Sequence, residues 1–219
     1  MRRLLFEKTG SAVWMSHLDL MRLMQRAFKR ATLPLTHSQG YNPRPSVSIA
    51  MPLSVGVESV CELLDFDLDA DVTISCDEIR EKLNATLVPG VKIRQVYEGG
   101  RKLKELALLQ CEVTLEYDRG VPESAAQQVA ALFQRDALIV PKKTKNGMQD
   151  QDIIPMIRKI QVQEQENKLL LHSCICCQNP SLNPMQLANA VTLHLPDMAP
   201  DFSRCKRIEL LDSKENVFR

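Results

Sequence analysis

The sequence predicts an α+β protein built from two tandem ferredoxin-like (βαββαβ) units, with antiparallel sheets that carry helices on one face. Along residues 1–98 the periodicities run strand, helix, strand, strand, helix, strand, which is the split βαβ order. A similar order returns after residue 106. Between them, GGRKLKEL interrupts both periodicities with two glycines and three basic residues. We therefore expect a first domain at 1–98, a linker at 99–106 and a second domain at 107–219.

In the first unit, residues 2–8 predict a strand and 16–32 predict a helix. Ser16 and Asp19 stand at capping-box spacing, so their plainest role is to satisfy the first backbone N–H groups of that helix. The apolar positions on one helix face are Leu20, Met24, Ala27, Phe28 and Ala31. The cations on the other face, within roughly a 100° arc, are Arg22, Arg26, Lys29 and Arg30. The helix is thus expected to be apolar on one side and cationic on the other.

The remaining elements of the first unit follow the same two periodicities. Residues 46–53 and 61–69 alternate like half-buried strands, and 91–98 closes the unit as a strand. Between them, 75–87 predicts a helix that Ser75 caps, with Glu78 at the third helical position.

The second half predicts strands at 108–118, 137–143, 167–177 and 204–213. Helices are predicted at 122–134 and at 183–195, the latter with Asn183 as cap and Pro184 in its first turn. The stretch DIIPMIRKI, 152–160, is interpreted as a short helical insert. The two halves share element order and no sequence identity.

Composition favours an ordinary globular protein. The chain has 219 residues, of which 44% are hydrophobic and 25% charged. No apolar run reaches the roughly 18 residues that span a bilayer. The N-terminal segment MRRLLFEKTG has charged residues too early to contain the apolar region of a signal peptide. Seven cysteines, an odd number with three crowded into CICC, suit reduced thiols. We expect a cytoplasmic protein with no membrane contact.

Charge is unevenly distributed although the net charge is only +1. Residues 1–50 hold eight Lys and Arg against Glu7 and Asp19, whereas 58–81 hold nine acids against Arg80. A basic surface that could meet a polyanion is therefore expected in the N-terminal part.

The loop THSQGYNPRPS, 36–46, combines stiffness with groups that bind ligands. Gly40 permits a positive φ, and Pro43 and Pro45 fix their own φ and restrict the residues before them. Tyr41 offers a ring for stacking and Arg44 a forked cation that suits phosphate. Next to the cationic helix, the loop is a candidate pocket for a nucleotide, an RNA strand or another anion. The alternative is a rigid crossover in which Tyr41 packs inward and Arg44 pairs with an acid of 58–81.

Other chemistry is less well supported by spacing. His17 and His37 could serve as an acid–base pair, but the helix between them separates them by more than about 20 Å. CICC lacks a repeated C-x₂-C spacing, and Cys177 would point away from Cys174 and Cys176 on a strand. His172 would lie on the same strand face as Cys174. A half-buried strand is sufficient to explain both residues without a metal site. No metal site and no cofactor are expected.

The stretch SHLDLMRLMQRAFKRATLPLTHSQGYNPRPSVSIAMPLSVGVES, 16–59, resembles the bacterial radical-SAM-linked protein family (domain of unknown function 2344) in its stand-alone form. A Ser-His-Leu-Asp segment, a basic helix and a Gly-aromatic-Asn-Pro loop recur there in this order. The matching residues are Ser16, His17, Asp19, Ser38, Gly40, Asn42 and Pro43. Tyr41 stands where phenylalanine is more usual, and Arg44 where histidine is common, which weakens any role for an imidazole at that position.

The resemblance implies a context. Its members are fused to or encoded beside a radical-SAM protein with a cobalamin-type domain, commonly near genes for ribosomal proteins and an RNA-processing ribonuclease. This chain has no C-x₃-C-x₂-C motif and so cannot itself hold the iron–sulfur cluster.

Three hypotheses follow. The first is an accessory RNA-binding module, without catalytic activity of its own, that presents RNA to the radical-SAM partner. Its RNA contacts would be Arg22, Arg26, Lys29, Arg30, Tyr41 and Arg44.

The second is a metal-independent RNA endonuclease in which His17 or His37 deprotonates a 2′-hydroxyl, by analogy with paired ferredoxin-like nucleases. The third is a protein-only scaffold whose acidic segment, 58–81, meets a basic surface of the partner.

Overall fold

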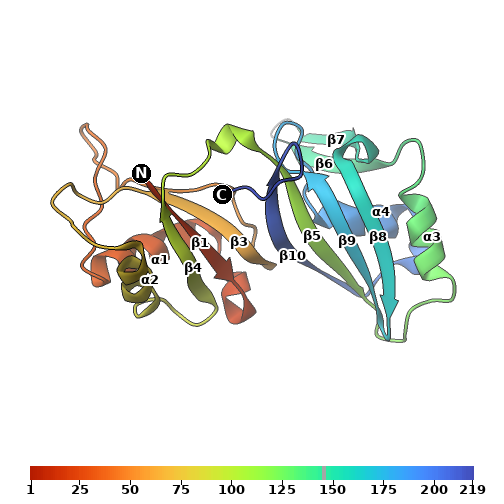
Figure 1. Cartoon of the computed structure of the whole chain (residues 1–219). Helices are drawn as coiled ribbons and strands as arrows, with labels where there is room; N and C mark the ends of the chain where they lie inside the picture. Colours follow the sequence, from red (N-terminus) through yellow and green to blue (C-terminus); the bar gives the residue numbers. More distant parts are fainter. Residues whose placement is uncertain (145–146) are drawn as a thin grey trace. The chain divides into compact units, whose positions relative to one another are not determined.

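The chain is an α+β protein, as the sequence predicts, in a computed structural model that describes residues 1–144 and 147–219. It divides into two compact units (Figure 1). Unit 1 comprises Met1–Leu103 together with Arg219, and unit 2 comprises Lys104–Phe218. Among the described residues, no helix is long and apolar enough to cross a membrane.

Unit 1 has one antiparallel sheet with the strand order β4-β1-β3-β2. Its elements in chain order are β1 (Arg2–Lys8), α1 (His17–Arg30), β2 (Val47–Ile49), β3 (Val57–Phe66), α2 (Cys76–Asn84) and β4 (Val91–Glu98), with a 3₁₀ turn at Gly10–Trp14. In the central strand, Leu4 lies opposite Leu64 of β3 and Val96 of β4. The predicted strands at 2–8 and 91–98 are confirmed, and β2 is shorter than predicted while β3 begins earlier.

The core of unit 1 forms where both helices pack on the sheet. All five predicted apolar positions of α1 are buried: Leu20, Met24, Ala27, Phe28 and Ala31. The ring centroid of Phe28 lies 4.8 Å from that of Phe66 on β3, and Ile79 of α2 belongs to the same cluster. Burying each such side chain contributes about 1.5–3 kcal/mol. The opposite, polar face of α1 is consequently held outward.

The predicted helix starts are confirmed by hydrogen bonds. The Ser16 hydroxyl accepts from the Asp19 N–H at 3.2 Å. Ser75 and Glu78 form a complete capping box, and the Ser75 N–H bond to the Glu78 carboxylate is the main cause that lowers the pKa of Glu78. In unit 2, the N-cap residue of α4 is Pro184, not Asn183 as predicted, although the Asn183 side chain accepts from the Met185 N–H at 3.1 Å.

Within unit 2, four strands of the main eight-stranded sheet pair antiparallel in the order β10-β5-β9-β8, and β6 and β7 form a separate hairpin. Its elements are β5 (Leu106–Glu116), α3 (Ala125–Leu132), β6 (Ile139–Thr144), β7 (Gly147–Asp152), β8 (Ile157–Gln165), β9 (Lys168–Cys176), α4 (Met185–His194) and β10 (Phe202–Asp212). The four predicted strands of this half and its predicted helices at 122–134 and 183–195 are confirmed, with ends that differ by a few residues.

The predicted helical insert at 152–160 is wrong. Only Ile154–Met156 forms a 3₁₀ turn, and the chain then enters β8. Ile160 and Val162 are half-buried and lie opposite Ser173 and Leu171 of β9, so pairing with a neighbouring strand decides the conformation. The strand β7 was not predicted, because its exposed sequence GMQDQD has no apolar alternation.

Candidate functional site

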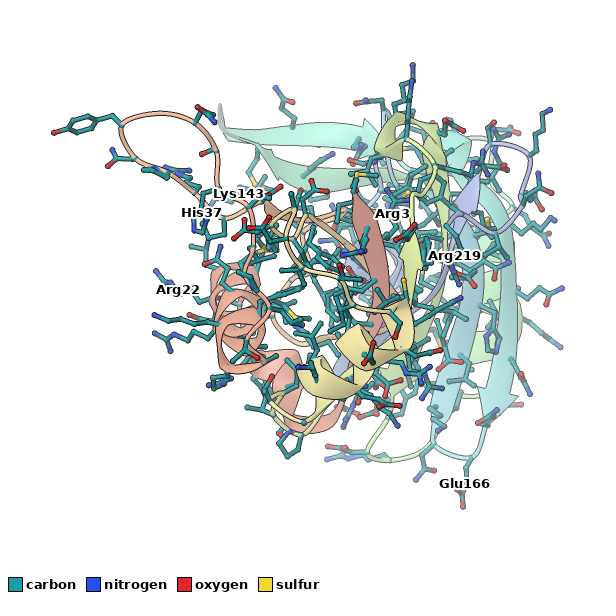
Figure 2. The ribbon with its side chains drawn as sticks, turned by 60° about the vertical axis from the view of Figure 1, so that its left-hand side comes forward. Arg3, Arg22, His37, Lys143, Glu166 and Arg219 are labelled. Carbon is teal, nitrogen blue, oxygen red and sulfur yellow. The ribbon has the colours of Figure 1, made fainter. Side chains whose placement is uncertain are left out.

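The four cations of α1 are all exposed, and they differ in their contacts. Arg22, which points away from the helix in Figure 2, lies 3.3 Å from the Asp19 carboxylate. The hydrogen bond from the Ser16 hydroxyl is the main cause that lowers the pKa of Asp19. Arg30 donates to the Thr86 carbonyl at 3.1 Å. Two of the four cations are therefore partly engaged within unit 1.

Arg26 and Lys29 are the less engaged pair. Neither forms an ion pair or a side-chain hydrogen bond with any residue that the structure describes. Both side chains face solvent one turn or less from the end of α1. Their charge is therefore available to an anionic ligand.

The loop at 36–46 is a narrow hairpin that projects from unit 1 (Figure 2). His37 and Pro45 form an antiparallel β-bridge at its base, and the Ser46 N–H donates to the Thr36 carbonyl at 2.7 Å. The Ser38 N–H donates to the Arg44 carbonyl at 2.8 Å, and the Ser38 hydroxyl accepts from the Arg44 N–H at 3.0 Å. These bonds close the base and leave 39–43 as the tip.

The tip is fully presented to solvent. Tyr41 is 100% exposed, so it does not pack inward as the crossover interpretation expects. Gly40 has φ +141°, in the region that favours glycine, and Asn42 and Pro43 are exposed beside it. Arg44 is also exposed, and among the described residues its side chain has no ion pair with the acidic segment.

The acids of 58–81 are largely occupied by contacts within unit 1. Asp65 lies 2.5 Å from the buried Arg3, and Asp67 lies 2.8 Å from the α-amino group of Met1. Asp77 pairs with Arg80 at 3.1 Å. The remaining contacts are the Ser75 capping box of Glu78 and the bond that buried Glu62 accepts from Ser59 at 2.7 Å. The acidic run therefore stabilises the fold more than it neutralises α1.

A groove of about 670 Å³ lies between the end of α1 and the base of the loop. Its lining residues are Gln25, Arg26, Phe28, Lys29, Thr32, Leu33, Pro34, Leu35, His37, Pro45 and Asp69. The volume is in the range of small-ligand sites, and the walls combine apolar side chains with a few charged ones. It brings together Arg26, Lys29 and His37, three of the predicted site residues.

The two predicted histidines are placed differently. His37 lines the groove, and His17 is the first residue of α1, with a buried Nδ1 that has no hydrogen-bond partner among the described atoms. The 14-residue helix between them is about 20 Å long. The structure thus gives each imidazole a separate environment.

Sequence reasoning missed Asp69 and the apolar wall of the groove. Asp69 comes to the site because Leu35 forms a β-bridge with Leu68 and the Asp69 N–H donates to the Pro34 carbonyl at 3.0 Å. The sequence signal for the apolar wall was the segment LPL, 33–35, in which apolar residues continue directly after the helix.

Several charged groups of unit 2 pair with one another. On its sheet, Arg204 lies 2.9 Å from Glu116, and His172 lies 3.4 Å from Glu112. All seven cysteines are free, and in the described part of the chain no group of three or more His, Cys, Asp or Glu side chains could hold a metal ion. The groove and the hairpin described above both lie in unit 1.

Comparison with known proteins gives a family and a fold. The model of a family described as "Uncharacterized protein conserved in bacteria (DUF2344)" matches residues 2–184. No curated protein matches the chain. A chain in the crystal structure of a Cbf5–Nop10–Gar1 complex is similar in fold, with a TM-score of 0.52 and 10% identity over 95% of this chain and 48% of that one. The protein thus spans about half the length of that solved chain. An unknown protein from Galdieria sulphuraria is 10% identical over 94% and 96% of the two chains, with a TM-score of 0.26.

Proposed function

Since the chain belongs to this bacterial DUF2344 family, we propose that it is a cytoplasmic accessory module that binds single-stranded RNA. In this proposal it presents the RNA to a radical-SAM partner with a cobalamin-type domain, in RNA or ribosome-related modification. The module has no catalytic activity of its own, and the RNA contacts lie in unit 1.

One observation carries the proposal. Three exposed cations that have no partner among the described residues, Arg26, Lys29 and Arg44, share unit 1 with a fully exposed tyrosine on a hydrogen-bonded hairpin. Single-stranded nucleic acid is bound by cationic grooves that follow the phosphates and by aromatic rings on which bases stack. Both kinds of group are present, and the hairpin lowers the entropy that Tyr41 loses on binding.

The strand orders support tandem ferredoxin-like units. Counting only the sheet strands, each unit has the spatial order fourth, first, third, second, which is the ferredoxin-like order. In unit 2 the β6–β7 hairpin would then be an insertion between α3 and the second sheet strand. We therefore propose tandem ferredoxin-like units at 1–98 and 107–219, joined by 99–106.

The alternatives have less support. A nuclease with paired imidazoles is disfavoured by the separation of His17 from His37. Incubating labelled RNA with the protein in EDTA tests it, since a cut ending in a 2′,3′-cyclic phosphate that His37→Ala abolishes would favour the nuclease. A scaffold that uses the acidic segment is disfavoured because five of its nine acids, Glu62, Asp65, Asp67, Asp77 and Glu78, have partners in unit 1.

The proposal is tested by the salt dependence of RNA binding. With about four to six phosphate contacts, log affinity should fall against log salt with a slope of roughly −3 to −4. The double variant Arg26→Ala/Lys29→Ala should reduce that slope by about 1.4, because each lost contact removes about 0.7. Arg135→Ala, which removes an exposed cation of unit 2, is the matched control and should leave the slope unchanged.

Filter binding with total cytosolic RNA provides the measurement. Absence of RNA retention by the parent protein at low salt would overturn the proposal. An unchanged slope in the double variant would place the RNA elsewhere on the molecule.

A further inference from the structure

The groove beside α1 has the size and chemistry of a site for one nucleotide. Its volume, about 670 Å³, suits a ligand of nucleotide size. Pro34, Leu35 and Pro45 supply an apolar wall, while Arg26 and Lys29 supply positive charge. Such a site would accept a ligand with a flat apolar ring at one end and an anionic group at the other.

Asp69 is the one acidic residue that lines the groove. Its backbone N–H donates to the Pro34 carbonyl, which fixes the residue beside the apolar wall. Its side chain has no ion pair or hydrogen bond within residues 1–144 and 147–219. Two cations and one carboxylate thus line the same groove without pairing with one another. An ionised carboxylate only accepts hydrogen bonds, so the ring that it meets should carry N–H donors.

The chain enters the groove through a strained residue. Thr32 has φ +55°, although it is β-branched, and its N–H donates to the Lys29 carbonyl at 3.2 Å. The Leu33 N–H donates to the Phe28 carbonyl at 3.0 Å, which completes a Schellman end. Because this motif satisfies terminal carbonyls, Arg26 and Lys29 are not needed for that purpose.

Resting on the proposed RNA-binding function, we infer that the groove holds one unstacked guanine nucleotide of the bound RNA. Arg26 and Lys29 contact its phosphate, and the base lies against Pro34, Leu35 and Pro45. Asp69 accepts hydrogen bonds from N1–H and N2–H of the base. Tyr41, at the tip of the hairpin, stacks on a different base of the strand.

Guanine follows from the number of donors on each base. Its Watson–Crick edge presents two adjacent N–H donors, which match the two oxygens of a carboxylate in a bidentate, charge-assisted pair. Adenine and cytosine each present one amino group next to a ring nitrogen that accepts hydrogen bonds. That nitrogen would face the carboxylate, which is also an acceptor, and the contact would be unfavourable. Uracil has one N–H between two carbonyl oxygens. A bidentate pair discriminates between bases by a factor of about ten or more.

The test is titration of the full chain with the 5′-monophosphates GMP, AMP, CMP and UMP, followed by calorimetry or NMR. GMP should bind about tenfold more tightly than the other three. Asp69→Asn should remove that preference while AMP affinity stays within about twofold, because the amide keeps the size of the side chain. Arg26→Ala/Lys29→Ala should weaken all four nucleotides. Asp136→Asn, an exposed acid of unit 2, is the matched control and should change nothing.

The outcomes separate the two proposals when RNA retention is measured on the same proteins. Equal affinity for all four nucleotides, or a GMP preference that survives in Asp69→Asn, overturns the guanine site even if RNA is retained. Loss of RNA retention by the parent overturns the RNA-binding function. Selective GMP binding without RNA retention overturns the inference as well, because the groove would then serve a free nucleotide.

Discussion

Arg3 and Arg26 show that arginine side chains serve two different purposes in this protein. Arg3 is 1% exposed, its guanidinium forms two hydrogen bonds to Asp65, and the bonded carboxylate raises its pKa. Removing one member of such a buried pair typically costs about 3–5 kcal/mol, so Arg3 is committed to the fold. Arg26 is exposed with no partner among the described residues, so it can bind a ligand at little cost to stability.

Tyr41 belongs to the second group. Because its side chain is fully exposed, Tyr41→Ala should leave the melting temperature within about one or two degrees of the parent. RNA affinity should fall by about 1–3 kcal/mol if one base stacks on the ring. Thermal melts and filter binding measure the two quantities.

Tyr117→Ala is the contrasting variant. This tyrosine is 4% exposed and donates to the Met198 carbonyl at 3.0 Å, so its truncation should cost on the order of 3 kcal/mol and lower the melting temperature by several degrees. A Tyr41→Ala protein that melts equally early, yet binds RNA like the parent, would refute the role of Tyr41 in binding.

At the scale of elements, α1 joins the core to the candidate site. Its apolar face fixes the helix on the sheet, and its end turns sharply at Thr32 toward the groove wall. The left-handed conformation costs a residue with a Cβ about 1–2 kcal/mol, which packing of the following residues, Leu33 and Leu35, must offset.

Thr32→Gly should therefore raise the free energy of unfolding by roughly 0.5–1 kcal/mol, after the larger backbone entropy of glycine in the unfolded chain is subtracted. Urea unfolding of both proteins measures the difference. Thr32→Ala is the control, since it keeps the Cβ and loses the hydroxyl bond to the Ala31 carbonyl at 2.7 Å. A gain in Thr32→Ala as large as that in Thr32→Gly would show that φ strain is not the cause.

Elements with strong periodicity were predictable, and those set by pairing were not. The two faces of α1 and the capping box of α2 follow from the spacing of residues within each helix, and both are confirmed. The strand β8 depends on β9 as a neighbour, and β7 depends on β6. The groove shows the same limit, because Asp69 reaches it only through strand pairing between segments more than 30 residues apart.

At the scale of the whole molecule, the seven free cysteines differ in accessibility. Cys111 and Cys177 are buried, and burial raises their thiol pKa values to about 11 and about 12. Cys76 and Cys176 are half-buried. Since the thiolate is the reactive form, a raised pKa keeps the buried thiols protonated and unreactive at neutral and mildly alkaline pH.

Iodoacetamide at pH 8 should thus modify Cys76 and Cys176 first, with Cys111 and Cys177 protected in the native protein. Peptide mass spectrometry after short exposures gives the order. In denaturant all seven cysteines should react at similar rates, which controls for local sequence. Modification of Cys177 as fast as Cys76 in the native protein would contradict the burial described here.

The hydrogen-bonded base of the hairpin makes its tip an exchangeable insert. His37 and Pro45 are already paired, so the chain closes the loop whatever lies between them. Loop-closure entropy changes by only about 0.6 kcal/mol for each doubling of length, so residues 39–43 can be shortened, lengthened or replaced at little cost. The scaffold and the ligand-contacting tip are therefore free to diverge separately, and a related protein could change what it recognises by altering this one segment.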